Sequence, residues 1–406
     1  MIETTNDPQI LKIRINNLIY RLDNLLGMGD GRNNGIGYGA IGIALEKFYL
    51  GRALNREDFS DQGLKIIENI LNTSVDKPNA LRSFNFLDGY AGLLSVLQNL
   101  SDNTLLEIDH SDFQNIEALI FEWTLAQINE NNVDFFYGGM GGFACLIERK
   151  YSPRFEFYAE KIVSEITLKM AHSKYNAIVN NLYNSLDHRK AAEINYSLAH
   201  GLSAVILCLI NLYQNGFEKQ EIILTIEKFI NSLLKLNDLY KSKNPNLSFV
   251  GAIDLEDNSP QFQKRLGWCY SDLNIIHLLY KAGYAFGNDA WINVADEKSK
   301  IVLKRVSYED TLIDNPFLCH GSLGVSHYYL KLFELTNKTM FKEASLYWLN
   351  KGVEFFDEHD NALFFSDEYK KTSDLNSLFY GIPGVILCLT SALNNDITNW
   401  SKIILL

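Results

Sequence analysis

Hydrophobic and polar positions alternate along the chain in two patterns that follow each other seven times. The first is a short opening, rich in glycine in most copies, followed by an apolar run with almost no charge, such as 204–210 (Ala-Val-Ile-Leu-Cys-Leu-Ile). The openings are residues 38–42, 88–92, 137–141, 200–204, 270–274, 320–324 and 380–384. An apolar run without a polar face is expected of a helix buried in a core. We therefore predict seven buried helices.

The second pattern is amphipathic, with charged residues at helical intervals. Within 113–130, for example, Ile116, Ile120 and Trp123 share one stripe and Glu117 lies off it. Such segments cover about 8–26, 59–73, 113–130, 154–175, 219–237, 290–306 and 341–356. Each is predicted to be a helix with one face on the core and one face in solvent. One amphipathic helix and one buried helix thus form each repeat.

No single repeat can bury its own apolar face, so the seven repeats are expected to share one core. An open stack would need a polar last repeat, but the last repeat stays apolar through 403–406. We therefore predict an all-α fold in which seven helical hairpins close into an α/α barrel, with seven inner and seven outer helices. A single domain is expected over residues 1–406, with loops or small insertions near 176–196 and 238–266, which are rich in Asn, Ser and Lys.

In such a barrel, the openings all lie at the same end of the inner helices, where glycine permits tight turns and close backbone approach. Residues 134, 200, 265–270 and 319–320 then occupy equivalent corners of different repeats. We expect their side chains to converge on one mouth of the barrel. A purely structural scaffold would need only the glycines, so the other polar residues at these corners indicate a function.

The composition narrows the class of protein. The chain has 406 residues, of which 47% are hydrophobic, and this is enough for a substantial core. Its net charge of −12 argues against a nucleic acid or an anionic membrane as partner and favours a basic peptide. Two uncharged stretches, 194–217 and 375–395, are about as long as a membrane span. Their polar and glycine-containing sequences indicate buried core helices, and no membrane span is expected.

The cysteines indicate a reducing compartment. There are five, an odd number, spread thinly over a long chain, unlike the dense pattern of secreted disulfide scaffolds. Residues 1–7 lack the basic flank and the apolar stretch of a secretory signal. We therefore expect a cytoplasmic protein. Cys145, Cys208 and Cys388 lie inside apolar runs and are expected to be buried thiols.

The other two cysteines have neighbours that suggest metal binding. Cys269 lies in Gly-Trp-Cys-Tyr (267–270), and Cys319 and His320 lie in Cys-His-Gly (319–321). Two thiolates and one imidazole can hold a zinc ion, and catalytic zinc sites use three protein ligands with a fourth position open for water or substrate. No fourth ligand is adjacent in the sequence. The alternative for both cysteines is a buried free thiol.

Trp-Cys-Tyr followed by Cys-His-Gly, at the fifth and sixth of seven repeats, resembles the lanthionine synthetase C family, the cyclases of lanthipeptide biosynthesis. The resemblance covers essentially the whole chain. It implies that Cys269, Cys319 and His320 bind Zn2+. The family's histidine in Ala-His-Gly matches His200, and its arginine four residues before the first zinc cysteine matches Arg265.

The activity that this resemblance implies is an intramolecular Michael-type addition. The thiol of a peptide cysteine adds to dehydroalanine or dehydrobutyrine and closes a (methyl)lanthionine thioether ring. Zinc suits this chemistry because a thiol that coordinates it loses its proton. The implied substrate is a dehydrated precursor peptide. Because the sequence has no Gly-x-x-x-x-Gly-Lys-[Ser/Thr] loop for ATP, we expect a separate dehydratase and, as a further partner, a transporter.

Four residues near the proposed ligands are candidates for catalysis. His200 can titrate near neutral pH and suits proton transfer, either to the enolate or from the thiol; its alternative is a structural role at a helix end. The family's aspartate at the start of the third repeat matches Asp134, which either orients His200 or caps a helix. Arg265 either stabilises the enolate oxygen or forms an ion pair, for which Asp134 is one partner. Tyr270 adjoins a proposed ligand and is expected to line the site.

One departure from the family pattern lies beside the proposed metal ligand. The family usually has Trp-Cys-Tyr-Gly-x-x-Gly, whereas Ser271 and Asn274 replace both glycines here. Asparagine tolerates the left-handed conformation better than most residues, and serine can satisfy local backbone groups. We therefore expect the turn to form and the substrate range, rather than the activity, to change.

Two other functions stay open. The LanC-like proteins of animals suggest addition of glutathione to dehydroamino acids, with the same zinc and an external thiol. The other alternative is a non-catalytic peptide-binding protein whose zinc is structural. The histidine at 200 and the absence of an adjacent fourth ligand argue against this last interpretation.

Overall fold

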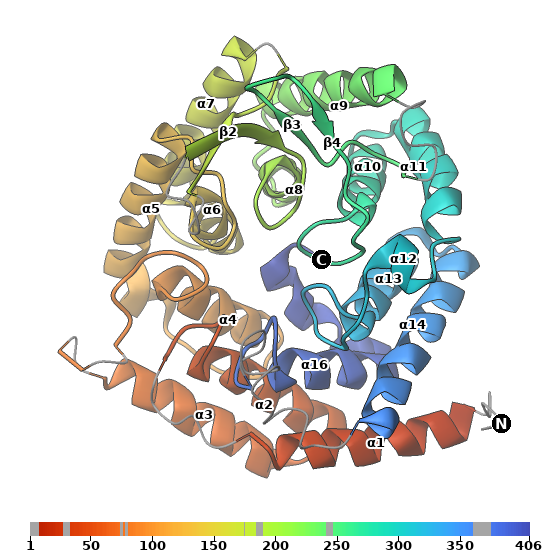
Figure 1. Ribbon diagram of the computed structural model, residues 1–406. Helices are drawn as coiled ribbons and strands as arrows, with labels where there is room; N and C mark the ends of the chain where they lie inside the picture. Colours follow the sequence, from red (N-terminus) through yellow and green to blue (C-terminus); the bar gives the residue numbers. More distant parts are fainter. Residues whose placement is uncertain are drawn as a thin grey trace.

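The computed structural model describes residues 8–26, 33–73, 76–77, 80–173, 175–183, 190–240, 247–359 and 375–406. Residues 1–7, on which the expectation of no secretory signal rests, lie outside this part of the chain. Helices form two concentric rings, and the chain passes around them in sequence order (Figure 1).

Within the described residues, each repeat contributes one helix to each ring. The inner helices are α2 (Ala40–Leu54), α4 (Tyr90–Asp102), α6 (Gly139–Glu148), α8 (Leu202–Gln214), α10 (Asp272–Phe286), α13 (Ser322–Thr336) and α16 (Ile382–Leu393). The outer helices are α1 (Pro8–Asp23), α3 (Glu57–Leu71), α5 (Gln114–Asn129), α7 (Phe155–His172), α9 (Gln220–Tyr240), α11 (Asp289–Val302) and α14 (Thr339–Glu358). Shorter helical segments are η1 (His110–Phe113), α12 (Tyr308–Thr311), η3 (Asn395–Ile397) and η4 (Asn399–Ile404). The predicted α/α barrel of seven hairpins is confirmed.

Burial distinguishes the two rings in the way the sequence patterns predict. The inner helix α8 buries every residue from Leu202 to Ile210. The outer helix α3 buries Phe59, Gly63, Ile67 and Ile70, which recur every three or four residues. A helix that is apolar on all sides needs neighbours on all sides, whereas a striped helix needs them on one. The ring arrangement satisfies both.

The ring closes between the last repeat and the first. Helix α16 packs against α2 and α1, and the hydroxyl of Ser377 donates a hydrogen bond to the carbonyl of Gly37. On the outside, Arg14 of α1 forms an ion pair with Asp357 of α14. The first and last repeats thus cover each other's apolar faces, as a closed array requires.

The end of the chain lies at the centre of the ring (Figure 1). In η4, Trp400 and Ile404 are fully buried. The ring of Trp400 stacks on His327 of α13 with a centroid distance of 4.6 Å. The indole Nε1 of Trp268 donates a 2.9 Å hydrogen bond to the carbonyl of Ile404. The C-terminal segment therefore packs inside the barrel and contacts the residue next to Cys269.

A small sheet lies in the two segments for which loops or insertions were expected. Strands β1 (Asn180–Tyr183), β2 (Lys190–Asn195), β3 (Ala252–Asp254) and β4 (Pro260–Gln261) form an antiparallel sheet in that order. Ile194 pairs with Ile253 across β2 and β3, and both are buried. The expectation was loops or small insertions, and the strands in these polar segments are ordered by pairing between residues far apart in the sequence. Residues 184–189 and 241–246 lie outside the described residues.

The two uncharged stretches expected to be core helices contain α8 and α16, which are almost wholly buried. Among the helices that the structure describes, none combines the length and the apolar content needed to cross a membrane. The five cysteines are free, and Cys145, Cys208 and Cys388 are buried thiols as expected.

Candidate metal centre

Three potential metal ligands meet at the mouth of the barrel. The sulfur atoms of Cys269 and Cys319 and a ring nitrogen of His320 all lie within 4.8 Å of one another. The backbone holds them together, since the amides of Trp268 and Cys269 both point at the carbonyl of Cys319, at 2.7 and 3.4 Å. The amide of Cys319 in turn donates to the carbonyl of Phe379 at 3.0 Å. Residues 50 positions apart are thus joined by direct backbone contacts between the openings of adjacent repeats.

The chemistry of this group fits a metal ion. Both cysteines are buried, and Nδ1 of His320 is buried without a hydrogen-bond partner among the described residues. A buried polar atom without a partner is costly, and coordination would remove that cost. Thiolate and imidazole donors suit soft and borderline metal ions. Three protein donors also leave a coordination position open for a further ligand.

The two cysteine thiols change each other's pKa. The neighbouring Cys319 and then His320 hold the pKa of Cys269 well below its usual value. Burial, together with the neighbouring Cys269 sulfur, raises the pKa of the Cys319 thiol. The pair therefore loses its first proton readily and its second with difficulty, unless a cation stabilises the second thiolate.

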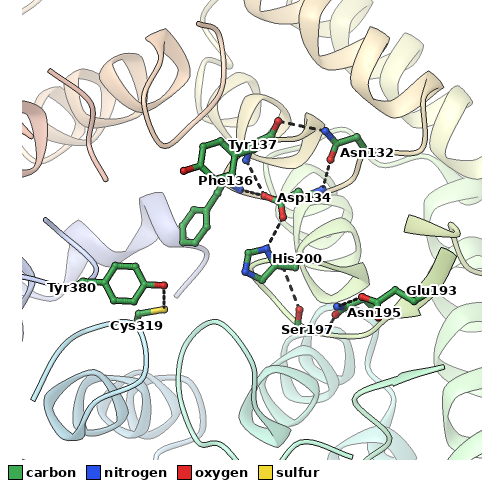
Figure 2. Close-up of polar contacts among 10 residues, drawn as sticks. All are labelled: Asn132, Asp134, Phe136, Tyr137, Glu193, Asn195, Ser197, His200, Cys319 and Tyr380. Atoms are coloured by element: carbon green, nitrogen blue, oxygen red, sulfur yellow. Dashed lines mark hydrogen bonds and ion pairs between the residues drawn. The ribbon is translucent and has the colours of Figure 1, made fainter. Parts of the chain in front are cut away.

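His200 and Asp134 form the second polar group at the mouth (Figure 2). Nδ1 of His200 lies 2.5 Å from Oδ2 of Asp134. The other carboxylate oxygen, Oδ1, accepts hydrogen bonds from the amides of Phe136 at 2.7 Å and Tyr137 at 2.8 Å. Of the two alternatives that the sequence left for Asp134, the structure shows the contact with His200, made by Oδ2. Asp134 does not cap α6, whose N-cap is Gly138 without a side-chain cap hydrogen bond, and its Oδ1 orders the preceding turn instead.

The environment of His200 favours its protonated form. Burial alone would lower the pKa of His200, but the hydrogen bond and the charge of Asp134 outweigh it, with a smaller contribution from Cys269, so the pKa is raised. Packing fixes the ring as well, because the Tyr270 ring lies 5.0 Å and the Phe136 ring 5.7 Å from it, centroid to centroid. His200 can therefore hold a proton at neutral pH in a defined position.

Arg265 and Tyr270 also lie at this mouth. The guanidinium of Arg265 donates a 3.1 Å hydrogen bond to the carbonyl of Leu312, whereas the carboxylate of Asp134 is engaged by His200. The ion pair between Arg265 and Asp134 that the sequence left open is therefore replaced by these contacts. The charge of Arg265 nevertheless reaches Cys319 and opposes the rise in its pKa. Burial raises the pKa of Tyr270, so its hydroxyl keeps its proton.

Tyr380 is a residue of this site that the sequence interpretation missed. Its hydroxyl lies 3.4 Å from Sγ of Cys319 (Figure 2). Burial and the two neighbouring cysteines raise its pKa. A signal was available, because Tyr380 opens the seventh repeat just as His200 and His320 open the fourth and sixth.

The turn before α10 forms although both family glycines are replaced. In the sixth repeat, a Cβ on Gly324 would lie 1.9 Å from the carbonyl oxygen of Leu318, six residues earlier. The equivalent carbonyl in the fifth repeat belongs to Trp268, and it accepts a 2.9 Å hydrogen bond from Nδ2 of Asn274. The carbonyl that leaves no room for a side chain in the sixth repeat is therefore, in the fifth repeat, the hydrogen-bond acceptor of Asn274.

Ser271 and Asn274 complete this turn by capping α10. The hydroxyl of Ser271 accepts from the amide of Leu273 at 3.0 Å, and Oδ1 of Asn274 accepts from the amide of Ser271 at 3.1 Å. The expectation that serine would hydrogen-bond a local backbone group is correct, because Ser271 accepts the amide of Leu273. The left-handed conformation was not needed at Asn274, because this residue lies in the first turn of α10 and its φ is not positive.

A closed ring of helical hairpins with an open group of two cysteines and one histidine defines an α/α toroid with a candidate thiolate metal centre. The sequence assigns the protein to a narrower class, a single family. The family model described as "Lanthionine synthetase C-like protein" matches residues 32–405, and the chain belongs to this family.

Among solved structures, the fold is similar to that of a protein named "Nisin cyclase". The TM-score is 0.72, the sequence identity is 19%, and the match covers 98% of each chain. No curated protein matches the sequence. The structural likeness supports the toroidal fold.

Proposed function

We propose that this protein is a zinc-dependent lanthipeptide cyclase that forms (methyl)lanthionine rings in a dehydrated precursor peptide. The observation that carries the proposal is the presence of two complementary groups at one mouth. Cys269, Cys319 and His320 offer an open set of metal ligands, and the Asp134–His200 pair offers a positioned proton. A structural zinc site would need neither the open position nor the second group.

The reaction is an isomerisation in which atoms balance without a co-substrate. The sulfur of a peptide cysteine forms a bond to Cβ of dehydroalanine or dehydrobutyrine, the C=C electron pair moves toward the adjacent carbonyl, and a proton is added at Cα. Cys269, Cys319 and His320 would hold the zinc. When bound, zinc supplies a lower pKa for the substrate thiol, so that its sulfur is nucleophilic at neutral pH.

His200 supplies the proton at Cα. Asp134 binds Nδ1, so that the other ring nitrogen, which points toward the side of the mouth where Cys319 lies, is the atom that delivers the proton (Figure 2). The raised pKa of His200 keeps this proton available near neutral pH. After transfer, His200 regains a proton from the thiol of the next substrate.

Arg265 and Tyr270 act around this step. The positive charge of Arg265 is held at the mouth by its hydrogen bond to Leu312 and stabilises the developing enolate oxygen. Tyr270 packs against His200 and shapes the wall that the substrate contacts. The net charge of −12 attracts a basic peptide. A separate dehydratase supplies the dehydrated peptide in the cytoplasm, and a transporter takes the product.

The test is a thiol count. The zinc-loaded protein is incubated with a dehydrated cysteine-containing peptide, and unreacted thiols are alkylated with N-ethylmaleimide and counted by mass spectrometry. We expect the number of alkylated thiols to fall with time and the Cys319→Ala variant to leave it unchanged.

Other outcomes would assign other functions. Peptide that gains the mass of glutathione only when glutathione is added would indicate the intermolecular reaction. A peptide that binds with all thiols still free would indicate a binding protein. Zinc-free, folded wild-type protein would remove the metal from the mechanism.

A further inference from the structure

Among the residues that the structure describes, the seventh repeat adds no ligand to the metal group, yet two of its residues contact that group. The hydroxyl of Tyr380 contacts Sγ of Cys319 at 3.4 Å, and the carbonyl of Phe379 accepts the amide of Cys319 at 3.0 Å. Two consecutive residues therefore hold both the side chain and the backbone of one proposed ligand.

We propose that Tyr380 is a positioning residue of the metal centre, whose hydroxyl donates a hydrogen bond to the thiolate of Cys319. A tyrosine hydroxyl carries a proton at neutral pH and a ligand thiolate carries none, so oxygen is the donor and sulfur the acceptor. The inference rests on the proposed function only in that Cys319 is a metal ligand.

The fold sets the direction of the Tyr380 hydroxyl. The ring of Tyr380 is nearly parallel to that of Tyr38 from the first repeat, with an interplanar angle of 12° and a centroid distance of 6.4 Å. The His320 ring packs against the Tyr380 ring at an interplanar angle of 65°, with a centroid distance of 5.5 Å. The hydroxyl of Ser377 accepts the amide of Tyr380 at 3.0 Å and itself donates to Gly37. The closure of the ring therefore holds Tyr380 in place.

The hydrogen bond has a consequence for the chemistry of the site. Donation to the sulfur reduces the negative charge that Cys319 can share with a metal, and the metal then polarises its open position more strongly. Hydrogen-bond partners of ligands typically change metal affinity or activity by about 10–100-fold. Tyr380 thus tunes the centre without coordinating it.

The test uses cobalt(II) as a spectroscopic substitute for zinc. Metal-free wild type, Tyr380→Phe and the control Tyr137→Phe are loaded with Co2+, and the sulfur-to-cobalt charge-transfer bands are recorded. Zinc affinity is measured by competition with a chromophoric chelator. Tyr137 opens the third repeat as Tyr380 opens the seventh, but its side chain is about half exposed, at 49%. Thermal unfolding of each metal-free chain checks its fold.

We expect Tyr380→Phe to move the charge-transfer bands to longer wavelength, because the sulfur becomes more electron-rich. We also expect it to weaken zinc binding about tenfold, because Cys319 loses the contact that holds its sulfur in the ligand position, and this loss outweighs the gain in donor strength. Tyr137→Phe should match the wild type in both measurements. Bands and zinc affinity unchanged in Tyr380→Phe would overturn the inference. Wild-type protein that binds neither metal would instead refute the zinc site of the proposed function.

A second change makes the test independent of any loss of folding in Tyr380→Phe. Replacement of Tyr380 by 3-fluorotyrosine keeps the ring and the hydroxyl and makes the hydroxyl a stronger donor. The charge-transfer bands should then move to shorter wavelength, opposite to the shift in Tyr380→Phe. Bands that stay in place would contradict the proposed hydrogen bond.

Discussion

The two oxygens of Asp134 have separate tasks at the mouth of the barrel. Oδ1 accepts the amides of Phe136 and Tyr137 and so orders the turn. Oδ2 binds Nδ1 of His200 and determines which ring nitrogen faces the candidate metal group. Because one oxygen is fixed by the backbone, the other presents its charge to His200 in a fixed direction. Among the groups that raise the pKa of His200, this carboxylate therefore contributes most.

The Asp134→Asn variant tests this dependence. An amide can keep the turn contacts of Oδ1, but it removes the charge that raises the pKa of His200, and burial then lowers that pKa. We expect the His200 midpoint, followed by NMR, to fall below that of the wild type. The alkaline limb of the cyclisation rate should move to lower pH, with about 100-fold lower activity at neutral pH.

The Asp134–His200 pair also makes the free energy of unfolding depend on pH. The folded pKa of His200 is raised, so its contribution to stability is present below the unfolded pKa and is lost as the pH rises through the folded pKa.

The Asp88→Asn variant is the control for the effect of Asp134→Asn on the His200 midpoint, since Asp88 opens the second repeat and is half-buried. An equal shift of the His200 midpoint in both variants would show that general charge at the mouth, and not Asp134, controls His200.

Among the elements of the ring, the fourth and fifth repeats are joined by helix packing, by the hydrogen bond from the amide of Ala199 to the carbonyl of Cys269 and by one polar side chain, that of Asn274. Asn274 is fully buried, and its Oδ1 accepts the amides of Leu198 at 3.2 Å and of Ser271 at 3.1 Å. Its Nδ2 donates to Trp268, at 2.9 Å, and to Tyr328, at 3.3 Å. Every one of these groups is buried or part of the turn beside Cys269. Replacement of the family glycine therefore exchanges close packing for a hydrogen-bond network.

We expect Asn274→Ala to lower the free energy of unfolding by roughly 2–4 kcal/mol, because buried amides without partners cost about 1–3 kcal/mol each. Ser271→Ala is the matched comparison and should cost about 1 kcal/mol, since it loses a helix cap. Urea denaturation of both variants measures the difference. Equal, small losses would mean that water replaces Asn274 in this turn.

For the molecule as a whole, the C-terminal segment fills the centre of the barrel, and the contacts between repeats one and seven close the ring around it. Trp400 lies inside the barrel on His327 and donates a 2.9 Å hydrogen bond to Ser391. Trp268, one residue before Cys269, donates to Ile404. The segment that ends the chain therefore supports the inner helices and the candidate metal centre together.

Trp400→Ala should accordingly destabilise the protein by about 3–5 kcal/mol, the usual cost of removing a large buried aromatic side chain. Leu239→Ala removes a side chain from α9 that is 69% exposed and should change stability by less than about 0.5 kcal/mol. Chemical denaturation gives both values. A Trp400→Ala variant as stable as Leu239→Ala would show that the barrel centre contributes little to stability.

Local patterns were sufficient to predict the helices of this protein. The amphipathic segment predicted at 219–237 is α9 (Gln220–Tyr240), and the one at 154–175 is α7 (Phe155–His172). Burial of a helix follows from the spacing of its own apolar residues, so it can be read along the chain. The closed barrel followed from the apolar last repeat, and the motifs around Cys269 and Cys319 indicated which side chains would meet.

Other features depend on residues far apart in the sequence and become visible once the chain is folded. The strands β2 and β3 pair across more than 50 residues, and no local pattern in their polar segments encodes that partner. Tyr380 and Cys319 meet because the seventh repeat packs between the sixth repeat and the first. The repeat, its helices and the candidate ligands could thus be predicted from local sequence patterns. The contacts of polar atoms between repeats, such as those of Asp134 with His200 and of Tyr380 with Cys319, follow from closure of the ring, because they depend on distances that spacing along a chain does not contain.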